Sequence, residues 1–249
     1  MWNILWALLL TAMTTALALG SSIFWSIYKL NVTERKLQRS LAKDPNNPRH
    51  LVRIAYWWQC KATRCHGDEQ TAAAAISLEY YERWLSIAEP SAWDHDYSRV
   101  KDMGRMAVLA GKYDKATLYA DRLLDIAARH PEQPCGNSLH RAHTILGFVA
   151  IHDGDMNAAS EHLRQSAEGP SSPQLGSFGP AMWLADELVR RGDTKTVAAY
   201  IVACRAFVDG DAALGPLGRW VATRRLRKLD RWQHACERGE LPDFGRSIR

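Results

Sequence analysis

Two stretches of the sequence share one spacing of small residues. Residues 103–116 read MGRMAVLAGKYDKA, and residues 146–159 read LGFVAIHDGDMNAA. In each stretch a Gly at the second position is followed seven residues later by another Gly, and five residues after that by an Ala. The shared spacing indicates an internal repeat. A looser third unit follows, from Leu184-Ala185 through the turn Arg191-Gly192-Asp193 to Cys204.

This spacing resembles that of the tetratricopeptide repeat. The resemblance implies that the first Gly lets one helix approach its partner, that the second Gly lies in the turn, and that the Ala packs where the helices cross. The two units lie 43 residues apart where that repeat has about 34, and we assign the excess to an insertion around residues 130–135. Residues 140–249 also resemble a group of bacterial membrane-anchored helical-repeat proteins, which implies no activity.

The periodicity of apolar residues predicts an all-α fold. From Thr33 onward apolar residues recur at intervals of three and four, without the alternation typical of strands. We expect an N-terminal transmembrane helix followed by an α-solenoid of antiparallel helix pairs. The expected parts are a transmembrane anchor (1–30), a basic juxtamembrane helix and linker (31–46), a tetratricopeptide-like repeat domain (47–215), and a basic capping helix and tail (216–249). Within the repeat domain, the segment 169–180 is rich in Gly, Pro and Ser and is expected to be a connection without helix.

The composition is that of a protein with a folded core. Of the 249 residues 47% are apolar, ten are Trp, and the formal net charge is +5, which excludes collagen-like, disordered and disulfide-dense classes. The charge is unevenly distributed. Residues 1–28 carry no charged side chain, whereas residues 216–249 carry nine basic and four acidic ones. The net charge therefore describes separate segments and is weak evidence for an acidic partner.

The uncharged first 28 residues predict a membrane anchor. They exceed the roughly 20 apolar residues that a spanning helix needs, and the aromatic residues that favour the two interfaces are Trp2, Trp6, Trp25 and Tyr28. The Lys and Arg that follow predict a single-pass membrane protein with a cytoplasmic body. Two alternatives stay open. One is a cleavable signal peptide ending near Ala16-Leu17-Ala18, and the other is an extracytoplasmic, periplasmic body.

One candidate redox site lies in the sequence CKATRCH at residues 60–66. Cys60 and Cys65, separated by four residues and followed by His66, resemble a less common c-type haem attachment site, with two thioether bonds and an axial His. Small, partly buried thiols at a helix end are the competing interpretation, which we favour. A disulfide between the two Cys requires that the body be extracytoplasmic. We therefore expect no cofactor.

A metal-site hypothesis rests on Cys135, His140 and His143. The two His lie three apart on one face of a predicted helix, and Cys135 lies just upstream, a spacing that can hold a metal ion. No fourth ligand is evident, so we favour partly exposed histidines without a metal. The sequence has no phosphate-binding Gly loop, nucleophile elbow or pair of metalloprotease histidines, and we expect no catalysis.

The C-terminal part predicts an amphipathic basic helix. Its apolar residues recur at helical spacing from Leu226 to Cys236. Its basic cluster consists of Arg224, Arg225, Arg227, Lys228 and Arg231. Such a helix can bind an anionic lipid, a nucleic acid or an acidic protein, or it can cap the last repeat with its basic side chains in water. We favour the cap. Nucleic acid is not expected as a partner, because no aromatic residues interleave the cluster.

These observations predict a membrane-anchored scaffold whose helical repeats bind partner proteins, with no catalysis of its own. The motivation is the combination of a predicted anchor with stacked helix pairs, whose surfaces commonly bind other proteins. The alternative is a redox or haem-linked protein that uses Cys60, Cys65 and His66 in an extracytoplasmic body.

Overall fold

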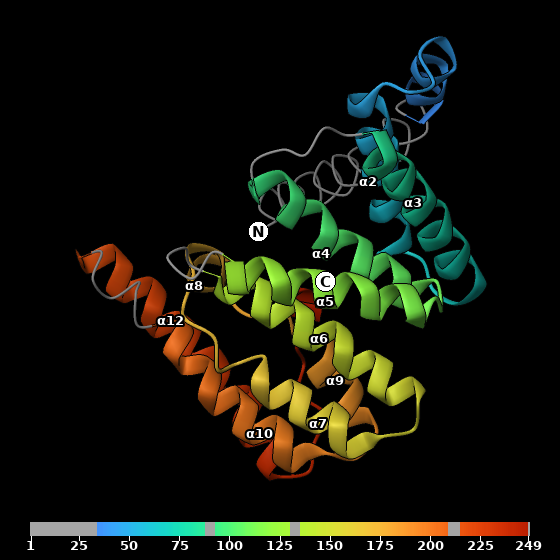
Figure 1. Cartoon of the computed structure of the whole chain (residues 1–249). Coiled ribbons are helices and arrows are strands. Elements are labelled where there is room, and N and C mark those ends of the chain that lie inside the picture. The colour runs from blue at the N-terminus through green and yellow to red at the C-terminus, as the bar shows by residue number, and fades with distance from the viewer. Residues whose placement is uncertain (1–33, 88–92, 130–134, 209–214, 249) are drawn as a thin grey trace, which may run out of the picture.

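The computed structural model describes residues 34–87, 93–129, 135–208 and 215–248, and every regular element within these ranges is a helix (Figure 1). A helix over residues 34–43 comes first. It is followed by α2 (Pro48–Ala62), α3 (Gly67–Ile87), α4 (Trp93–Leu109), α5 (Tyr113–Arg129), α6 (Gly136–His152), α7 (Met156–Gln165), α8 (Pro173–Phe178), α9 (Trp183–Arg190), α10 (Thr194–Ala203), the short 3-10 helix η1 (Cys204–Phe207), α12 (Gly215–Glu237) and η2 (Gly245–Ile248). The prediction of an all-α fold is confirmed for the described residues.

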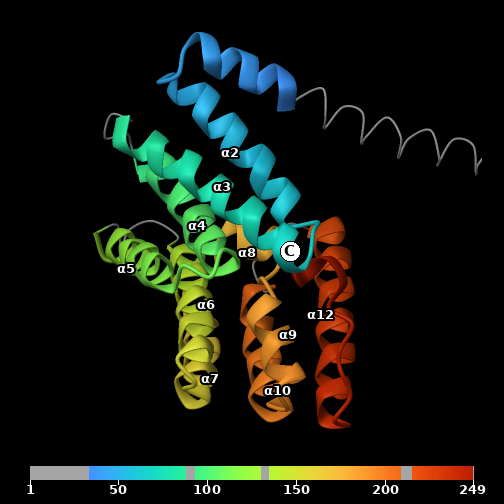
Figure 2. The same cartoon turned by 90° about the vertical axis from the view of Figure 1, so that its right-hand side faces the viewer.

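Consecutive helices pack as four pairs: α2 with α3, α4 with α5, α6 with α7, and α9 with α10. The first helices of successive pairs also contact one another, α2 against α4, α4 against α6, and α6 against α9. We call α2, α4, α6 and α9 the first-helix layer. The long helix α12 packs against α10. In Figure 2 the α6–α7 pair, the α9–α10 pair and α12 lie side by side.

The turns inside three of these pairs share one geometry. At each turn a backbone N–H donates to the carbonyl oxygen five residues earlier, Lys112 to Ala107, Asp155 to Ala150 and Asp193 to Leu188, at 2.8, 2.9 and 3.0 Å. The residue before each donor is a Gly with positive φ: Gly111 at 67°, Gly154 at 80° and Gly192 at 97°. This is the Schellman arrangement, which favours Gly because it has no Cβ to clash. The three turns therefore lie where the sequence predicted them.

Two glycines let neighbouring pairs approach closely. A Cβ built on Gly104 would lie 2.5 Å from Ile145 Cδ1 in α6, and one built on Gly147 would lie 2.3 Å from Leu184 Cδ2 in α9. The resemblance implied that each Gly accommodates the partner helix of its own pair. In the structure the nearest atom belongs instead to the first helix of the next pair. The two glycines therefore hold the first-helix layer together.

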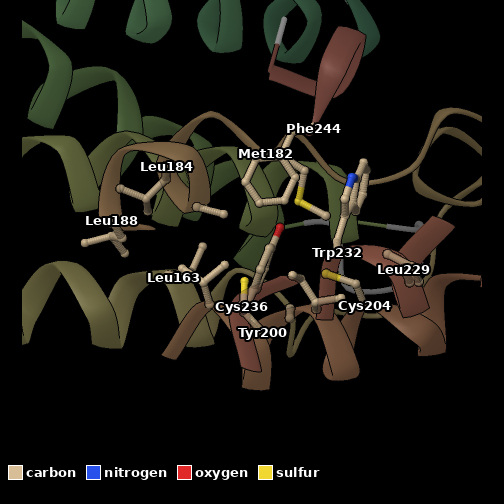
Figure 3. Close-up of a cluster of buried hydrophobic side chains, with 14 of the residues drawn as sticks. Leu163, Met182, Leu184, Leu188, Tyr200, Cys204, Leu229, Trp232, Cys236 and Phe244 are labelled. Atoms are coloured by element: carbon tan, nitrogen blue, oxygen red, sulfur yellow. The ribbon is translucent and has the colours of Figure 1, made fainter. Parts of the chain in front are cut away.

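The C-terminal segment folds back onto the core. Figure 3 shows Leu163, Leu184, Tyr200, Trp232 and Phe244 converging from α7, α9, α10, α12 and the segment after it. Phe244 is fully buried, and the Trp232 indole N–H donates to the carbonyl oxygen of Asp243 at 2.7 Å. The N–H of Met182, just before α9, donates to the carbonyl oxygen of Ser247 at 2.7 Å. The apolar side of α12 and the end of the chain thus close one core.

The predicted connection at 169–180 contains a short helix, α8, which corrects the expectation of no helix. Pro173 occupies its first turn, where a missing N–H costs nothing, and the Ser172 hydroxyl accepts a hydrogen bond from the N–H of Leu175 at 3.1 Å. Gly179, with φ 77°, ends it. The Ser, Pro and Gly residues that indicated a loop therefore form a short helix: Ser172 caps it, Pro173 begins it and Gly179 ends it.

The predicted localisation as a single-pass membrane protein is overturned. Among the described residues, no helix combines the length and the apolar character that crossing a bilayer requires. The longest helices there, α3 and α12, carry charged residues along their length, such as Glu79 and Arg227. The expected anchor (1–30) falls on residues 1–33, which lie outside the described residues.

We predict that Gly147→Val destabilises the protein by about 1–3 kcal/mol, because the added carbons overlap Leu184 and push α6 away from α9. Urea unfolding followed by circular dichroism measures the change. Leu118→Ala is the control, since Leu118 is 61% exposed on α5 and its truncation should change the free energy of unfolding by less than about 0.5 kcal/mol. Equal stability of Gly147→Val and the wild type would contradict the close packing of the first-helix layer.

Candidate functional site

An apolar hollow lies between the helix over residues 34–43, α2 and α4. Its volume is about 470 Å³. It is lined by Leu37, Val52, Arg53, Tyr56, Trp57, Cys60 and Arg99. Tyr56 is 54% exposed. A hydrogen bond with Cys60, together with that group's charge and burial, raises the pKa of the Tyr56 phenol. The hollow thus offers apolar walls with two arginines among them.

A polar network connects this hollow to α4. The hydroxyl of Tyr81, fully buried in α3, donates to Gln59 Oε1 at 2.6 Å, and the Gln59 amide in turn hydrogen-bonds the Asp102 carboxylate. Arg99 also hydrogen-bonds Tyr81. Burial raises the pKa of Asp102. This pKa is lowered by Lys101, Gln59, Arg141 and Arg99. Asp102 is therefore a half-buried carboxyl group that depends on its polar neighbours.

A second, basic hollow lies on the other side of α4. It has a volume of about 330 Å³ and lies between α4, the first turns of α6, and the segment from α8 to Ala181. Its polar lining consists of Lys101, Asn137, His140, Arg141 and Gln174. The Asn137 amide donates to Gln174 Oε1 at 3.0 Å, which fixes the two amides relative to each other. Because Arg99 and Lys101 are two residues apart on a helix, the two hollows open on opposite sides of α4.

Four cations surround Asp102, and they repel one another. Burial and, to a lesser degree, the charges of Arg141 and Arg99 lower the pKa of Lys101. Burial and the charge of Arg141 lower the pKa of Arg105 to about 10. Asp102 attracts both side chains but is the single carboxylate among the causes of these shifts. We call Arg99, Lys101, Arg105 and Arg141 the cation cluster.

Aromatic rings support one edge of the cation cluster. The Arg105 guanidinium lies 5.3 Å from the centre of the Trp183 ring, within the range of a cation–π interaction. Trp183 in turn stacks on Phe148 of α6, with ring centres 4.1 Å apart and an interplanar angle of 24°. These contacts join α4, α6 and α9, so the cluster sits on the same layer that the two glycines hold together.

Sequence reasoning missed the cation cluster. Its members come from helices some 40 residues apart in the chain, and no motif connects them. One local signal existed. Lys101 and Arg105 are like charges four residues apart on one helix, and such a pair destabilises the helix. The structure adds Arg141, which comes to the same place because α6 packs on α4.

The structure separates the three residues of the predicted redox site. Cys60 lies in the wall of the apolar hollow, whereas Cys65 and the exposed His66 lie in the turn between α2 and α3. Both Cys are free thiols. Burial and the nearby Glu69 raise the pKa of Cys65, the opposite of what an activated thiolate needs. The redox or haem-linked function stays a prediction, and no contact among the described residues adds to it.

His140, one of the predicted metal ligands, has both ring nitrogens occupied by the protein itself. Nδ1 lies 3.0 Å from the carbonyl oxygen of Ser166, and Nε2 accepts a hydrogen bond from the N–H of Ala181 at 3.0 Å. A carbonyl oxygen only accepts, so Nδ1 carries the proton and the ring is neutral. Burial, aided by the charge of Arg141, lowers the pKa of His140 to about 3. His140 thus links α6 to the end of α7 and to the segment before α9.

The other two predicted ligands do not join His140. His143 pairs instead with His162 of α7, with the two Nδ1 atoms 3.3 Å apart, and Cys135 precedes α6 as a free thiol that makes no capping hydrogen bond. Burial and the charge of His162 lower the pKa of His143. Across the described ranges, no three His, Cys, Asp or Glu side chains are grouped to hold a metal ion.

The five basic residues predicted as an anionic surface on α12 divide into two sets. Arg224, Arg227 and Arg231 are exposed, whereas Arg225 and Lys228 line a small hollow beside Trp232 and Ser247. Lys228 Nζ lies 4.5 Å from the centre of the Trp232 ring and donates to the Ser247 hydroxyl at 2.9 Å. Burial lowers the pKa of Lys228. Lys228 therefore holds the C-terminal segment, while the three exposed arginines face solvent.

Comparison of the chain with family models, with curated proteins and with solved structures finds no match. The resemblance to the tetratricopeptide repeat therefore stays an expectation.

We predict that His140→Gln removes a pH dependence of stability. The unfolded chain keeps the ordinary His pKa of 6.5, while the folded chain does not protonate His140 until about pH 3. The unfolded state alone takes up this proton, so stability is present above pH 6.5 and falls below it by about 1.4 kcal/mol per pH unit. Urea unfolding should show that the loss between pH 7 and pH 5 is smaller in His140→Gln by roughly 2 kcal/mol.

The control for this measurement is His234→Gln, which replaces an exposed histidine on α12. It should keep the wild-type pH dependence. If His140→Gln lost as much stability between pH 7 and pH 5 as the wild type does, His140 would not be a neutral, buried link.

Proposed function

We propose that this protein is a helical-repeat scaffold that binds an acidic segment of a partner protein across α2, α4 and α6. The observation that carries the proposal is the cation cluster. Four positive side chains gather near Asp102 on the first-helix layer, where burial and the charge of Arg141 lower the pKa values of Lys101 and Arg105. Charge held at a cost to stability is characteristic of functional surfaces. The proposal includes no catalytic step.

The apolar hollow specifies the kind of segment further. Its walls include Leu37, Val52 and Trp57, which suit one apolar side chain, and Arg53 and Arg99 suit acidic residues beside it. A segment that crosses α4 would bring its acidic residues from these arginines to Lys101 and Arg141. Helical-repeat proteins commonly bind extended segments across several helices in this way.

The test is the binding of short peptides of matched length to the full chain, followed by fluorescence anisotropy. We expect acidic peptides that contain a Leu or Phe to bind, neutral and basic ones not to bind, and the affinity to fall as salt is added. The double variant Arg53→Gln, Arg141→Gln should lose about tenfold or more in affinity, because it removes one charge from each hollow.

The matched control is the double variant Arg224→Gln, Arg227→Gln. It removes the same two charges from the exposed face of α12 and should bind within about twofold of the wild type. An equal loss in both double variants would mean that only net charge matters. A loss in the α12 variant alone would move the binding surface to the tail. Either result would overturn the proposal.

A further inference from the structure

Two histidines of the α6–α7 pair bring their Nδ1 atoms together. His143 of α6 and His162 of α7 place these atoms 3.3 Å apart, with the ring centres 5.5 Å apart and an angle of 29° between the rings. Both side chains are partly exposed, so solvent reaches both residues. In a neutral imidazole one nitrogen carries the proton and the other has a lone pair, which is the atom that a metal ion binds.

The separation of the two nitrogens matches that of two ligands on one tetrahedral ion. Hydrogen bonds donated by N–H groups mostly span roughly 2.7–3.2 Å, and 3.3 Å lies just beyond this range. Two imidazole nitrogens bound to Zn²⁺ at about 2.0–2.1 Å, with a tetrahedral angle between them, lie about 3.3–3.4 Å apart. Neighbouring ligands of a square-planar Cu²⁺ ion lie about 3 Å apart. The distance therefore favours a tetrahedral ion.

The charges around the pair also favour a cation. Burial and the charge of His162 lower the pKa of His143, so this ring is neutral at pH 7 and its lone pair is available. The carboxylates of Glu161 and Glu168 act in the opposite direction and favour positive charge at His143. Arg164 forms ion pairs with both carboxylates. They therefore contribute negative potential at the pair rather than metal ligands.

The described residues provide two ligands and no third. No group of three His, Cys, Asp or Glu among them is placed to hold an ion. An ion bound to two imidazoles keeps its other two tetrahedral positions for water, so it binds more weakly than in a structural zinc site with four protein ligands. The sequence indicated His143 as a ligand but not His162, which is 19 residues further along the chain and on the next helix.

We propose that His143 and His162 together bind one Zn²⁺ ion through their Nδ1 atoms. The ion links α6 to α7, with water in its remaining positions. Imidazole nitrogens suit Zn²⁺, whereas Mg²⁺ and Ca²⁺ prefer oxygen ligands. This inference is independent of the proposed function, because neither His belongs to the cation cluster or lines either of its hollows.

The first experiment titrates the full chain with Zn²⁺ under reducing conditions, against a chelating indicator dye. We expect one site per chain, and a rise of the midpoint of thermal unfolding in Zn²⁺ but not in Mg²⁺. His143→Gln and His162→Gln should each weaken this site by about tenfold or more. Circular dichroism checks that both variants are folded.

Two control variants should bind Zn²⁺ as the wild type does. His234→Gln removes an exposed histidine of α12, and Cys135→Ser removes the free thiol before α6 that the sequence indicated as a ligand. The absence of a Zn²⁺ site in the wild type would overturn the proposal. Unchanged binding in His143→Gln or His162→Gln would overturn it as well, and so would an equal loss in either control.

The second experiment uses the wild type alone, so it does not depend on the folding of a variant. Co²⁺ replaces Zn²⁺ on the same ligands and absorbs visible light strongly in a tetrahedral site but weakly in an octahedral one. We expect strong visible absorption that Zn²⁺ abolishes. A weak, octahedral spectrum, or a near-ultraviolet band from a cobalt–thiolate bond, would overturn the assignment of two imidazoles on a tetrahedral ion.

The outcomes for the two proposals are distinguishable. If Zn²⁺ binds as described but acidic peptides do not bind, the proposed function fails and this inference stands. If acidic peptides bind but the chain has no Zn²⁺ site, this inference fails and the proposed function stands.

Discussion

The close packing of α4, α6 and α9 determines where the functional side chains lie. These helices approach one another at Gly104 and Gly147, where even a Cβ would overlap a neighbouring side chain. The same approach brings Arg141 of α6 beside Lys101 and Arg105 of α4. The cation cluster is therefore a consequence of helix stacking. A wider spacing between the helices would place the charges in water, where their repulsion would be weak.

His140 connects this layer to the segment before α9. Its two hydrogen bonds hold the carbonyl of Ser166 and the N–H of Ala181, and the segment between these residues includes α8, which forms one wall of the basic hollow. The ring is neutral and buried, so it shapes the hollow without adding charge. The described C-terminal residues reinforce the same segment through the bond between Met182 and Ser247.

Local patterns allowed the helix pairs and their turns to be predicted. The turns need a residue with positive φ, and Gly supplies it at residues 111, 154 and 192. The site could not be predicted in the same way. The partners of His140 lie 26 and 41 residues away, and Arg141 meets Lys101 only through tertiary packing. The basic cluster on α12 was predicted as an anionic surface because its members are close in sequence. In the structure Lys228 of that cluster instead donates a hydrogen bond to Ser247 and holds the C-terminal segment. Residues 1–33 lie outside the described structure, and the membrane assignment built on them has no support from the helices that it does describe.

The most direct test of the account is the free energy of unfolding of Arg141→Met, which keeps the length of the side chain and removes its charge. If Arg141 serves a ligand at a cost to the fold, Arg141→Met should be as stable as the wild type or more stable in urea unfolding at low salt, because repulsion with Lys101 and Arg105 is relieved. A loss of more than about 1 kcal/mol would show that Arg141 serves the fold and would contradict the central claim.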